Sequence, residues 1–206
     1  MKKTFGMMLF FILGIAVNTA FAVPKEVIII RHGDKLLQPE PGPTLSPKGI
    51  VRSLAFAHYF INQFGEPDFI VATAPINEQG KDSSIRELQT IAPLANLVAA
   101  HHAKTDFPIL HPYKSSEFSR LANYLLKDKK FAGKKILICW NHTVIPQLAE
   151  TLGVSESLQV WPSDDFDTVY VLQYDSKGAV TQFKMLHNQY PVTFNGSWQE
   201  LYNKVK

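Results

Sequence analysis

The chain has 206 residues, of which 46% are hydrophobic and 19% charged, with 11 Gly and 13 Pro. This composition excludes a disordered chain, a collagen-like repeat and a membrane protein with several spans. The formal net charge is only +3 and the basic residues are scattered, so nothing indicates a nucleic-acid-binding protein. The single cysteine, Cys139, lies in an apolar run and has no partner for an internal disulfide, so we expect a buried, inert thiol.

Residues 1–22 have the layout of a secretory signal peptide. Two lysines precede the apolar run 5–17, and Ala20-Phe21-Ala22 places small residues around a larger one. We expect cleavage after Ala22, which removes 22 of the 206 residues and leaves 184 in one periplasmic or secreted domain, 23–206. After cleavage no stable membrane insertion is expected. The alternative is a retained membrane anchor, for which the apolar run is short.

The first predicted elements of the mature chain are a strand, a helix and a second strand. Residues 26–31 form a β-branched run typical of a strand that is buried on both faces. Ser46 and the proline after it predict the N-cap and first position of a helix, which Gly65 ends. The apolar run 68–73 predicts the second strand.

The next predicted elements are two helices, a strand and a further helix. Ser84, with an acidic residue three positions later, has the capping-box pattern and predicts the start of a helix. Apolar spacing predicts a helix over about 116–127, and the run 135–140 predicts the third strong strand. The next helix must begin near Asn141 or His142, because its proline at position 146 is tolerated only in the first turn.

The last predicted elements are the strands 168–174 and 180–186. The turn residues 175–178 between them predict a β-hairpin. Because strands and helices alternate along the rest of the chain, we expect a mainly parallel sheet with helices on both faces. The predicted fold is therefore a single three-layer α/β/α domain with an antiparallel hairpin toward its C-terminus.

Polar residues follow three of the predicted strands, at the edge where ligands bind in sheets of this kind. These segments are Arg31-His32-Gly33-Asp34-Lys35, Thr73-Ala74-Pro75 and Asn141-His142-Thr143. A neutral imidazole is a competent nucleophile toward phosphorus, and guanidinium groups match phosphate oxygens. The helix expected to begin near His142 would add free N–H donors. The combination is suited to phosphoryl transfer.

Arg31-His32-Gly33 after a buried strand resembles the signature of the histidine phosphatase (phosphoglycerate mutase-like) superfamily. Three later segments are similar to segments of that family and occur in the same order: 45–49 (LSPKG), 84–90 (SIRELQT) and 140–148 (WNH followed by IP and L). The matches extend from about residue 27 to 153, roughly two-thirds of the mature chain. The resemblance implies a three-layer α/β/α fold and hydrolysis of phosphate monoesters without a metal or other cofactor.

The resemblance also implies roles for single residues. His32 would attack phosphorus and become phosphohistidine, and Arg31, Arg86 and His142 would bind the phosphoryl oxygens. His142 would also stabilise the charge that develops as the ester bond breaks. The structural alternatives are salt-bridge roles for the two arginines, a hydrogen-bonding role for His32 and a helix cap at His142. The pair His101-His102 is expected on the surface, without a metal.

The sequence departs from the family in two places. The polar stretch 74–85 is longer than in compact members and is expected to shape the rim of the pocket. Acid-phosphatase members carry Asp directly after the second histidine, whereas this chain has Thr143. The proton for the leaving group would then come from Asp34, from Glu117 or from no side chain at all.

The functional prediction is an exported phosphomonoesterase that acts through phosphohistidine on a small phosphorylated substrate. The alternatives are a catalytically weak or inactive phosphate-binding module, which Thr143 favours, and a histidine-ligated metal hydrolase. A mutase is disfavoured because its substrates are cytoplasmic. Phe166, Trp161 and Tyr190 are candidates for lining the entrance, although core packing is expected for at least one of them.

Overall fold

The computed structural model describes residues 23–36, 42–76 and 84–204, so the predicted signal peptide and most of the polar stretch 74–85 lie outside it. Six strands form one sheet in the order β3-β2-β4-β1-β5-β6. Strands β3, β2, β4 and β1 are parallel, and β5 and β6 are antiparallel to their neighbours. The strands are β1 (Glu26–Arg31), β2 (Phe69–Ala72), β3 (Ile109–Leu110), β4 (Lys135–Trp140), β5 (Val169–Tyr174) and β6 (Val180–Leu186).

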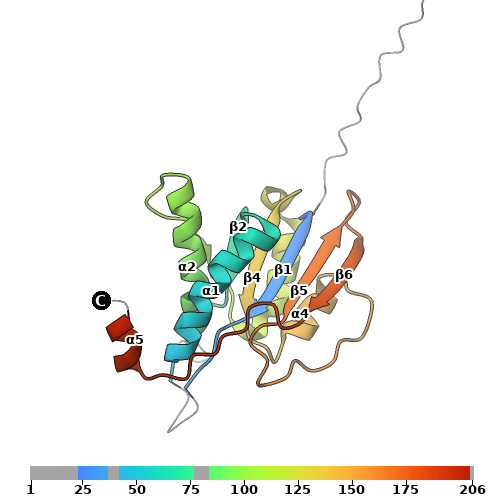
Figure 1. Cartoon of the computed structure of the whole chain (residues 1–206). Helices are drawn as coiled ribbons and strands as arrows, with labels where there is room; N and C mark the ends of the chain where they lie inside the picture. Colours follow the sequence, from blue (N-terminus) through green and yellow to red (C-terminus); the bar gives the residue numbers. More distant parts are fainter. Residues whose placement is uncertain (1–22, 37–41, 77–83, 205–206) are drawn as a thin grey trace, which may run out of the picture.

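Helices cover both faces of the sheet (Figure 1). They are α1 (Pro47–Phe64), α2 (Arg86–His101), α3 (Phe118–Lys127), α4 (Ile145–Thr151) and α5 (Trp198–Lys204), with short 3₁₀ turns at Ser115–Glu117 and Lys129–Phe131. Within the described ranges, no helix is sufficiently long and apolar to cross a membrane. The predicted α/β class, with its mainly parallel sheet and C-terminal hairpin, is confirmed.

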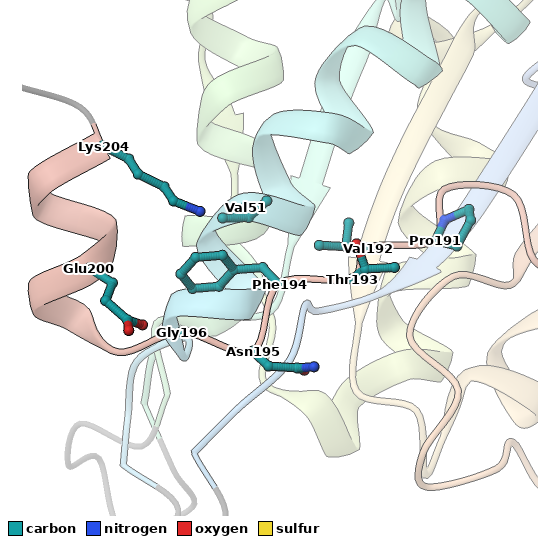
Figure 2. A pocket seen from close by; sticks show the side chains of 9 residues that line it. All are labelled: Val51, Pro191, Val192, Thr193, Phe194, Asn195, Gly196, Glu200 and Lys204. Carbon is teal, nitrogen blue, oxygen red and sulfur yellow. The ribbon is translucent and has the colours of Figure 1, made fainter.

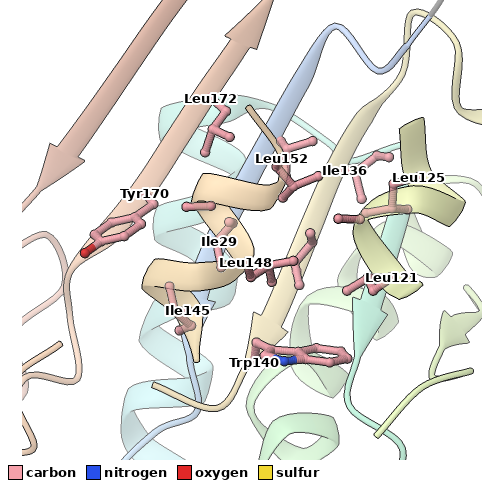
Figure 3. Packing of buried hydrophobic residues seen from close by; sticks show 14 of the residues in the cluster. Ile29, Leu121, Leu125, Ile136, Trp140, Ile145, Leu148, Leu152, Tyr170 and Leu172 are labelled. Atoms are coloured by element: carbon pink, nitrogen blue, oxygen red, sulfur yellow. The ribbon is translucent and has the colours of Figure 1, made fainter. Parts of the chain in front are cut away.

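Strand β1 lies in the middle of the sheet and contributes to two cores. Ile28 and Ile30 pack toward α1 and α2, whereas Val27 and Ile29 pack toward α3 and α4, and none of the four has exposed surface. Figure 3 shows the second core, in which side chains of α3 and α4 meet the sheet. Successive strand residues point to opposite faces, so a continuous apolar run is what a doubly covered strand requires. Cys139 is buried in the first core as a free thiol, as predicted.

Helix α1 has the predicted boundaries and is attached to the loop after β1. The Ser46 hydroxyl accepts a hydrogen bond from the Gly49 N–H (3.1 Å) and donates to the Asp34 carbonyl (3.1 Å). Gly65, with φ of 70°, ends the helix. The Ser46 side chain therefore caps the start of α1 and also fixes the backbone just after β1.

The close contact between Gly49 and this loop leads to a stability prediction. A Cβ atom on Gly49 would lie 2.2 Å from the Asp34 carbonyl oxygen, whereas a Cβ on Gly42 would meet nothing within 4 Å. We expect Gly49→Ala to lower the free energy of unfolding by about 1–3 kcal/mol, because backbone must move to accept the methyl group. Urea unfolding of Gly49→Ala and of the control Gly42→Ala tests this, and equal stabilities of the two variants would refute the contact.

Helix α4 begins at Ile145, so the predicted start near Asn141 or His142 is wrong. Residues 141–144 form a turn instead, in which the Val144 N–H donates to the Asn141 carbonyl (3.1 Å). The Asn141 side chain accepts from the Thr143 N–H (3.0 Å) and hydroxyl (2.9 Å). This side-chain turn competes successfully with a helical start. The expectation of helix N–H donors beside His142 is therefore also wrong.

The remaining differences concern element ends and short elements. Helix α2 begins at Arg86 rather than at Ser84, whose hydroxyl accepts from the Arg86 N–H (3.2 Å) and donates to the Glu87 carboxylate (3.0 Å). Helix α3 begins at residue 118 rather than 116, after a 3₁₀ turn. Strand β3 and helix α5 were not predicted, because two and seven residues are too few for a clear periodicity.

Candidate active site

The carboxyl ends of β1 and β4 bring the candidate residues together. Arg31, the last residue of β1, pairs in register with Trp140, so His32 and His142 follow at the same edge of the sheet. Arg86 reaches this edge from the first position of α2. A cavity of about 520 Å³ opens here, with Arg31 and His142 in its wall. Four residues that the sequence singled out thus share one region, the lower edge of the sheet in Figure 1.

His32 is held as a neutral imidazole, and among the described residues one of its ring nitrogens has no hydrogen-bond partner. The residue is 3% exposed, and Nδ1 lies 2.8 Å from the Gly33 carbonyl oxygen, to which it donates. Burial, reinforced by the charges of Arg31 and Arg86, lowers the pKa of His32 to about 3. With the proton on Nδ1, the lone pair of Nε2 is available for attack. Burial is the larger cause of the neutral state, and the two arginines add to it.

The three guanidinium nitrogens of Arg31 have different environments. Its Nη1 donates to the carbonyls of Pro162 (3.2 Å), Ser163 (2.8 Å) and Asp165 (3.0 Å), which anchors the loop before β5. Its Nε and Nη2 are buried and have no hydrogen-bond acceptor among the described residues. The Phe166 ring stacks 3.9 Å from Cζ. Burial lowers the pKa of Arg31 to about 10, so the guanidinium still carries its charge at neutral pH.

Arg86 and His142 complete a set of unsatisfied nitrogen atoms. Arg86 donates through Nη1 to the Gly42 carbonyl (2.5 Å), but its buried Nε finds no acceptor in the described part of the chain. The buried Nδ1 of His142 is likewise without a partner there. Burial, followed by the charges of Arg31 and Lys35, lowers the pKa of His142 to about 4.

Buried polar atoms in folded proteins are almost always hydrogen-bonded, because an unmade bond costs about 1–3 kcal/mol. Here four such nitrogens belong to Arg31, Arg86 and His142, the three residues whose charges act on the His32 imidazole. Two of these residues carry fixed positive charge. A tetrahedral oxyanion offers several acceptor oxygens and a matching negative charge, so it would satisfy all four nitrogens together.

A larger hollow lies elsewhere. About 760 Å³ in volume, it separates the start of α1 from the C-terminal segment, with Val51, Phe194 and Lys204 among its lining residues (Figure 2). It contains no histidine and only one cation, which is itself 4.8 Å above the Phe194 ring. The smaller cavity is the better candidate for chemistry, because Arg31 and His142 in its wall carry three of the four unsatisfied nitrogens. His32 and Arg86 are not among its lining residues.

Several solved structures are similar to the chain over most of its length. The protein histidine phosphatase SixA complexed with tungstate is 18% identical, with 79% of this chain and 96% of that chain aligned and a TM-score of 0.49. A phosphoserine phosphatase from Entamoeba histolytica is 14% identical, with 81% of this chain and 99% of that chain aligned and a TM-score of 0.47. A mycobacterial glucosyl-3-phosphoglycerate phosphatase is 12% identical, with 84% of this chain and 98% of that chain aligned and a TM-score of 0.42.

These neighbours belong to the histidine phosphatase superfamily. At such low identities the likeness concerns the fold alone. No protein-family model matches the sequence, and the search of curated proteins finds no match.

Not every predicted residue lies at the cavity. Phe166 lines it, as expected. Trp161 packs in one core and Tyr190 in the other, so neither lines the entrance. Thr73-Ala74-Pro75 also lies outside the cavity wall, and the Ala74 N–H donates to the Tyr113 carbonyl (2.7 Å). His142 is not a helix cap, because the turn 141–144 separates it from α4.

The two proposed acids make other interactions. Asp34 lines the cavity, but its carboxylate contacts Arg52 Nε (2.6 Å) and Lys48 Nζ (3.5 Å). Glu117 is not in the cavity wall; it caps a 3₁₀ turn and pairs with Arg120. The Lys114 N–H, which donates to Glu117, holds the pKa of that carboxyl below its usual value. Glu117 is therefore held as a carboxylate away from the cavity, and the Asp34 carboxylate is engaged by two cations.

The loop before β5 was missed as part of the site. Ser163 and Asp164 line the cavity, and Ile30 of β1 pairs with Val169 of β5. Because β5 is antiparallel to β1, the chain enters β5 at the edge where β1 ends. The predicted antiparallel hairpin could have indicated that the segment before β5 lies at this edge. Because only residues that follow the carboxyl ends of strands were considered, this segment was missed.

The pair His101-His102 lies on the surface, as predicted. The two rings contact the Glu66 carboxylate through His101 Nδ1 (2.8 Å) and His102 Nε2 (2.7 Å). Across residues 23–36, 42–76 and 84–204, no group of three or more His, Cys, Asp or Glu is arranged to hold a metal ion. The contacts with Glu66 join the ends of α1 and α2 instead.

The lowered pKa values of the site histidines predict acid sensitivity. In the folded protein His32 and His142 have pKa values of about 3 and about 4, below their ordinary value of 6.5. As the pH falls from 6.5 toward 4, the unfolded chain binds protons that the folded chain does not, so stability decreases. Urea unfolding at pH 7 and pH 5 should show a smaller loss for His32→Asn than for wild type. The exposed control His58→Asn should behave like wild type, and equal pH dependence of all three proteins would contradict the neutral state of His32.

Proposed function

We propose that this protein is a metal-independent phosphomonoesterase that forms a phosphohistidine intermediate on His32. The observation that supports this most strongly is that, within the described residues, His32 Nε2 has no hydrogen-bond partner and four buried nitrogens of Arg31, Arg86 and His142 are unsatisfied. The SixA neighbour was solved with tungstate and the mycobacterial neighbour with inorganic phosphate, both tetrahedral oxyanions. We infer that the same class of anion binds here, as the phosphoryl group of a small substrate.

The first step of the proposed reaction transfers the phosphoryl group to the enzyme. The Nε2 lone pair of His32 forms a bond to phosphorus while the bond from phosphorus to the ester oxygen breaks. Arg31, Arg86 and His142 hold the other oxygens and stabilise their charge in the transition state. The ester oxygen leaves with the bonding electrons and takes up a proton. In the second step water attacks phosphorus, the bond to nitrogen breaks and inorganic phosphate leaves.

A phosphate-binding module is the second candidate. It is favoured by Thr143, which stands where a carboxyl is expected and whose hydroxyl is occupied with Asn141. Both candidates use the same anion site, but only the enzyme releases phosphate. Binding without release would therefore support the module.

Phosphate release separates the two candidates. The purified protein is assayed on 4-nitrophenyl phosphate, sugar phosphates, nucleotides and phosphorylated glycolipid fragments, with and without a chelator. We expect release from 4-nitrophenyl phosphate and from at least one natural class, unchanged by the chelator. Loss of release in chelator would support the metal hydrolase and contradict the phosphohistidine pathway. Orthophosphate that binds with no release from any ester would support the module.

We further propose that the protein is exported and loses residues 1–22. Two lysines, an apolar run and Ala20-Phe21-Ala22 occur in the order that a signal peptidase requires. N-terminal sequencing of the exported protein is expected to begin at Val23. Recovery of an intact Met1 end in the membrane fraction would contradict both cleavage and the periplasmic or secreted location.

A further inference from the structure

The proposed reaction lacks a group that gives a proton to the leaving oxygen. Among the described residues, the two carboxylates that line the cavity are Asp34 and Asp164. Asp34 is bound to Arg52 through two contacts, of 2.6 and 3.5 Å, and it also faces Lys48. These contacts occupy the Asp34 carboxylate and tie the loop after β1 to α1, so Asp34 is assigned a structural role.

Other carboxylates near the site are engaged or lie outside the cavity wall. The Asp165 carboxylate accepts from the Thr168 hydroxyl (2.6 Å) and N–H (3.0 Å). Asp167 faces Arg52 (3.6 Å). Glu87 is 4% exposed, accepts from the Ser84 hydroxyl and does not line the cavity. Burial raises the pKa of Glu87, so it remains the rival that an experiment has to address.

Asp164 differs from all of these. It is an exposed residue that lines the cavity with Arg31, His142 and Phe166, and within the described ranges its carboxylate makes no hydrogen bond or ion pair. Its backbone position is nevertheless fixed, because the carbonyls of its neighbours Ser163 and Asp165 both accept from Arg31 Nη1. The Arg31 guanidinium thus also anchors the segment that carries Asp164.

We propose that the Asp164 carboxyl protonates the leaving oxygen of the substrate. The inference rests on the proposed phosphohistidine reaction. As the bond from phosphorus to the ester oxygen breaks, the proton of Asp164 moves to that oxygen, and an alcohol leaves. The carboxylate then accepts a proton from the water that attacks phosphohistidine, which restores the acid.

The role of Asp164 is tested by comparing a substrate that has a poor leaving group with one that has a good leaving group. For Asp164→Asn, kcat/KM on an alkyl phosphate is expected to fall by about 10²–10⁴-fold, and on 4-nitrophenyl phosphate by less than tenfold, because a good leaving group needs no acid. The parameter kcat/KM is chosen because it covers only the steps up to loss of the leaving group. The exposed control Asp106→Asn should match wild type on both substrates.

Matched variants test the rivals. Asp34→Asn should reduce both activities alike, since it loses the Arg52 contact, whereas Glu117→Gln should change neither. Equal losses on both substrates in Asp164→Asn, no loss at all, or a selective alkyl-phosphate loss in Glu87→Gln would each overturn the assignment. If wild type cleaves neither substrate, the proposed function itself fails. If wild type cleaves both and Asp164→Asn shows no selectivity, only the role of Asp164 fails.

Discussion

Replacement of His32 by alanine is expected to reduce phosphate release by about 10⁴–10⁶-fold, the scale seen when a nucleophile is removed. The reason is that the Nε2 lone pair forms the bond to phosphorus, and the neighbouring His142, with its buried Nδ1 turned to the same site, is assigned to oxygen binding. Steady-state release from 4-nitrophenyl phosphate measures the loss.

The same variant should remain folded, because within the described residues the His32 ring makes only a local hydrogen bond, to the carbonyl of the next residue. Circular dichroism and urea unfolding check this, with the exposed His58→Ala as the control for removal of an imidazole. Turnover by His32→Ala above a few per cent of wild type, in a folded protein, would contradict the nucleophile assignment.

Arg31→Ala should lower both activity and stability. The variant removes two nitrogens that face the anion site, and we expect kcat/KM to fall by at least about 10³-fold. It also leaves three carbonyls of the loop before β5 without their donor. Hydrogen bonds to a charged group contribute about 1.5–3 kcal/mol each, and partial compensation by water leaves an expected loss of about 2–4 kcal/mol.

Arg86→Ala provides the contrast. Among the described residues the Arg86 side chain makes one hydrogen bond, to the Gly42 carbonyl, so the variant should lose about 10²–10³-fold in kcat/KM with little change in stability. Kinetics on 4-nitrophenyl phosphate and urea unfolding of both variants separate the two roles, with the exposed Arg120→Ala as control. Unchanged kcat/KM in Arg86→Ala, or a stability loss equal to that of Arg31→Ala, would contradict this division.

The central part of the fold was predictable because its signals are strong and local. The run 26–31 is apolar without alternation, which requires cover on both faces, and both cores are present. Ser46 and Gly65 mark the ends of α1 by backbone chemistry that any context preserves. The start of α4 was mispredicted because the side chain of Asn141 binds the N–H of Thr143 and stabilises a turn. Helix propensity and the position of proline do not predict a turn that is stabilised by a side chain.

The site was predictable wherever its residues follow parallel strands or begin a helix. His32 and His142 come after β1 and β4, and Arg86 begins α2, so topology alone brings them to one edge. The anchoring of Arg31 by the loop before β5 depends on contacts more than 130 residues apart, which no local pattern contains. The role of Asp164 follows from those contacts, which is why the sequence left the acid unassigned.

The most direct test of the account is the chemical identity of the phosphoenzyme. The protein is mixed with ³²P-labelled substrate, quenched in alkali within milliseconds, digested and mapped by mass spectrometry. The label is expected as alkali-stable, acid-labile phosphohistidine on the peptide that contains His32, and it should be absent from His32→Ala. Label on His142 or on a serine, or rapid phosphate release with no label on any peptide, would contradict nucleophilic catalysis by His32.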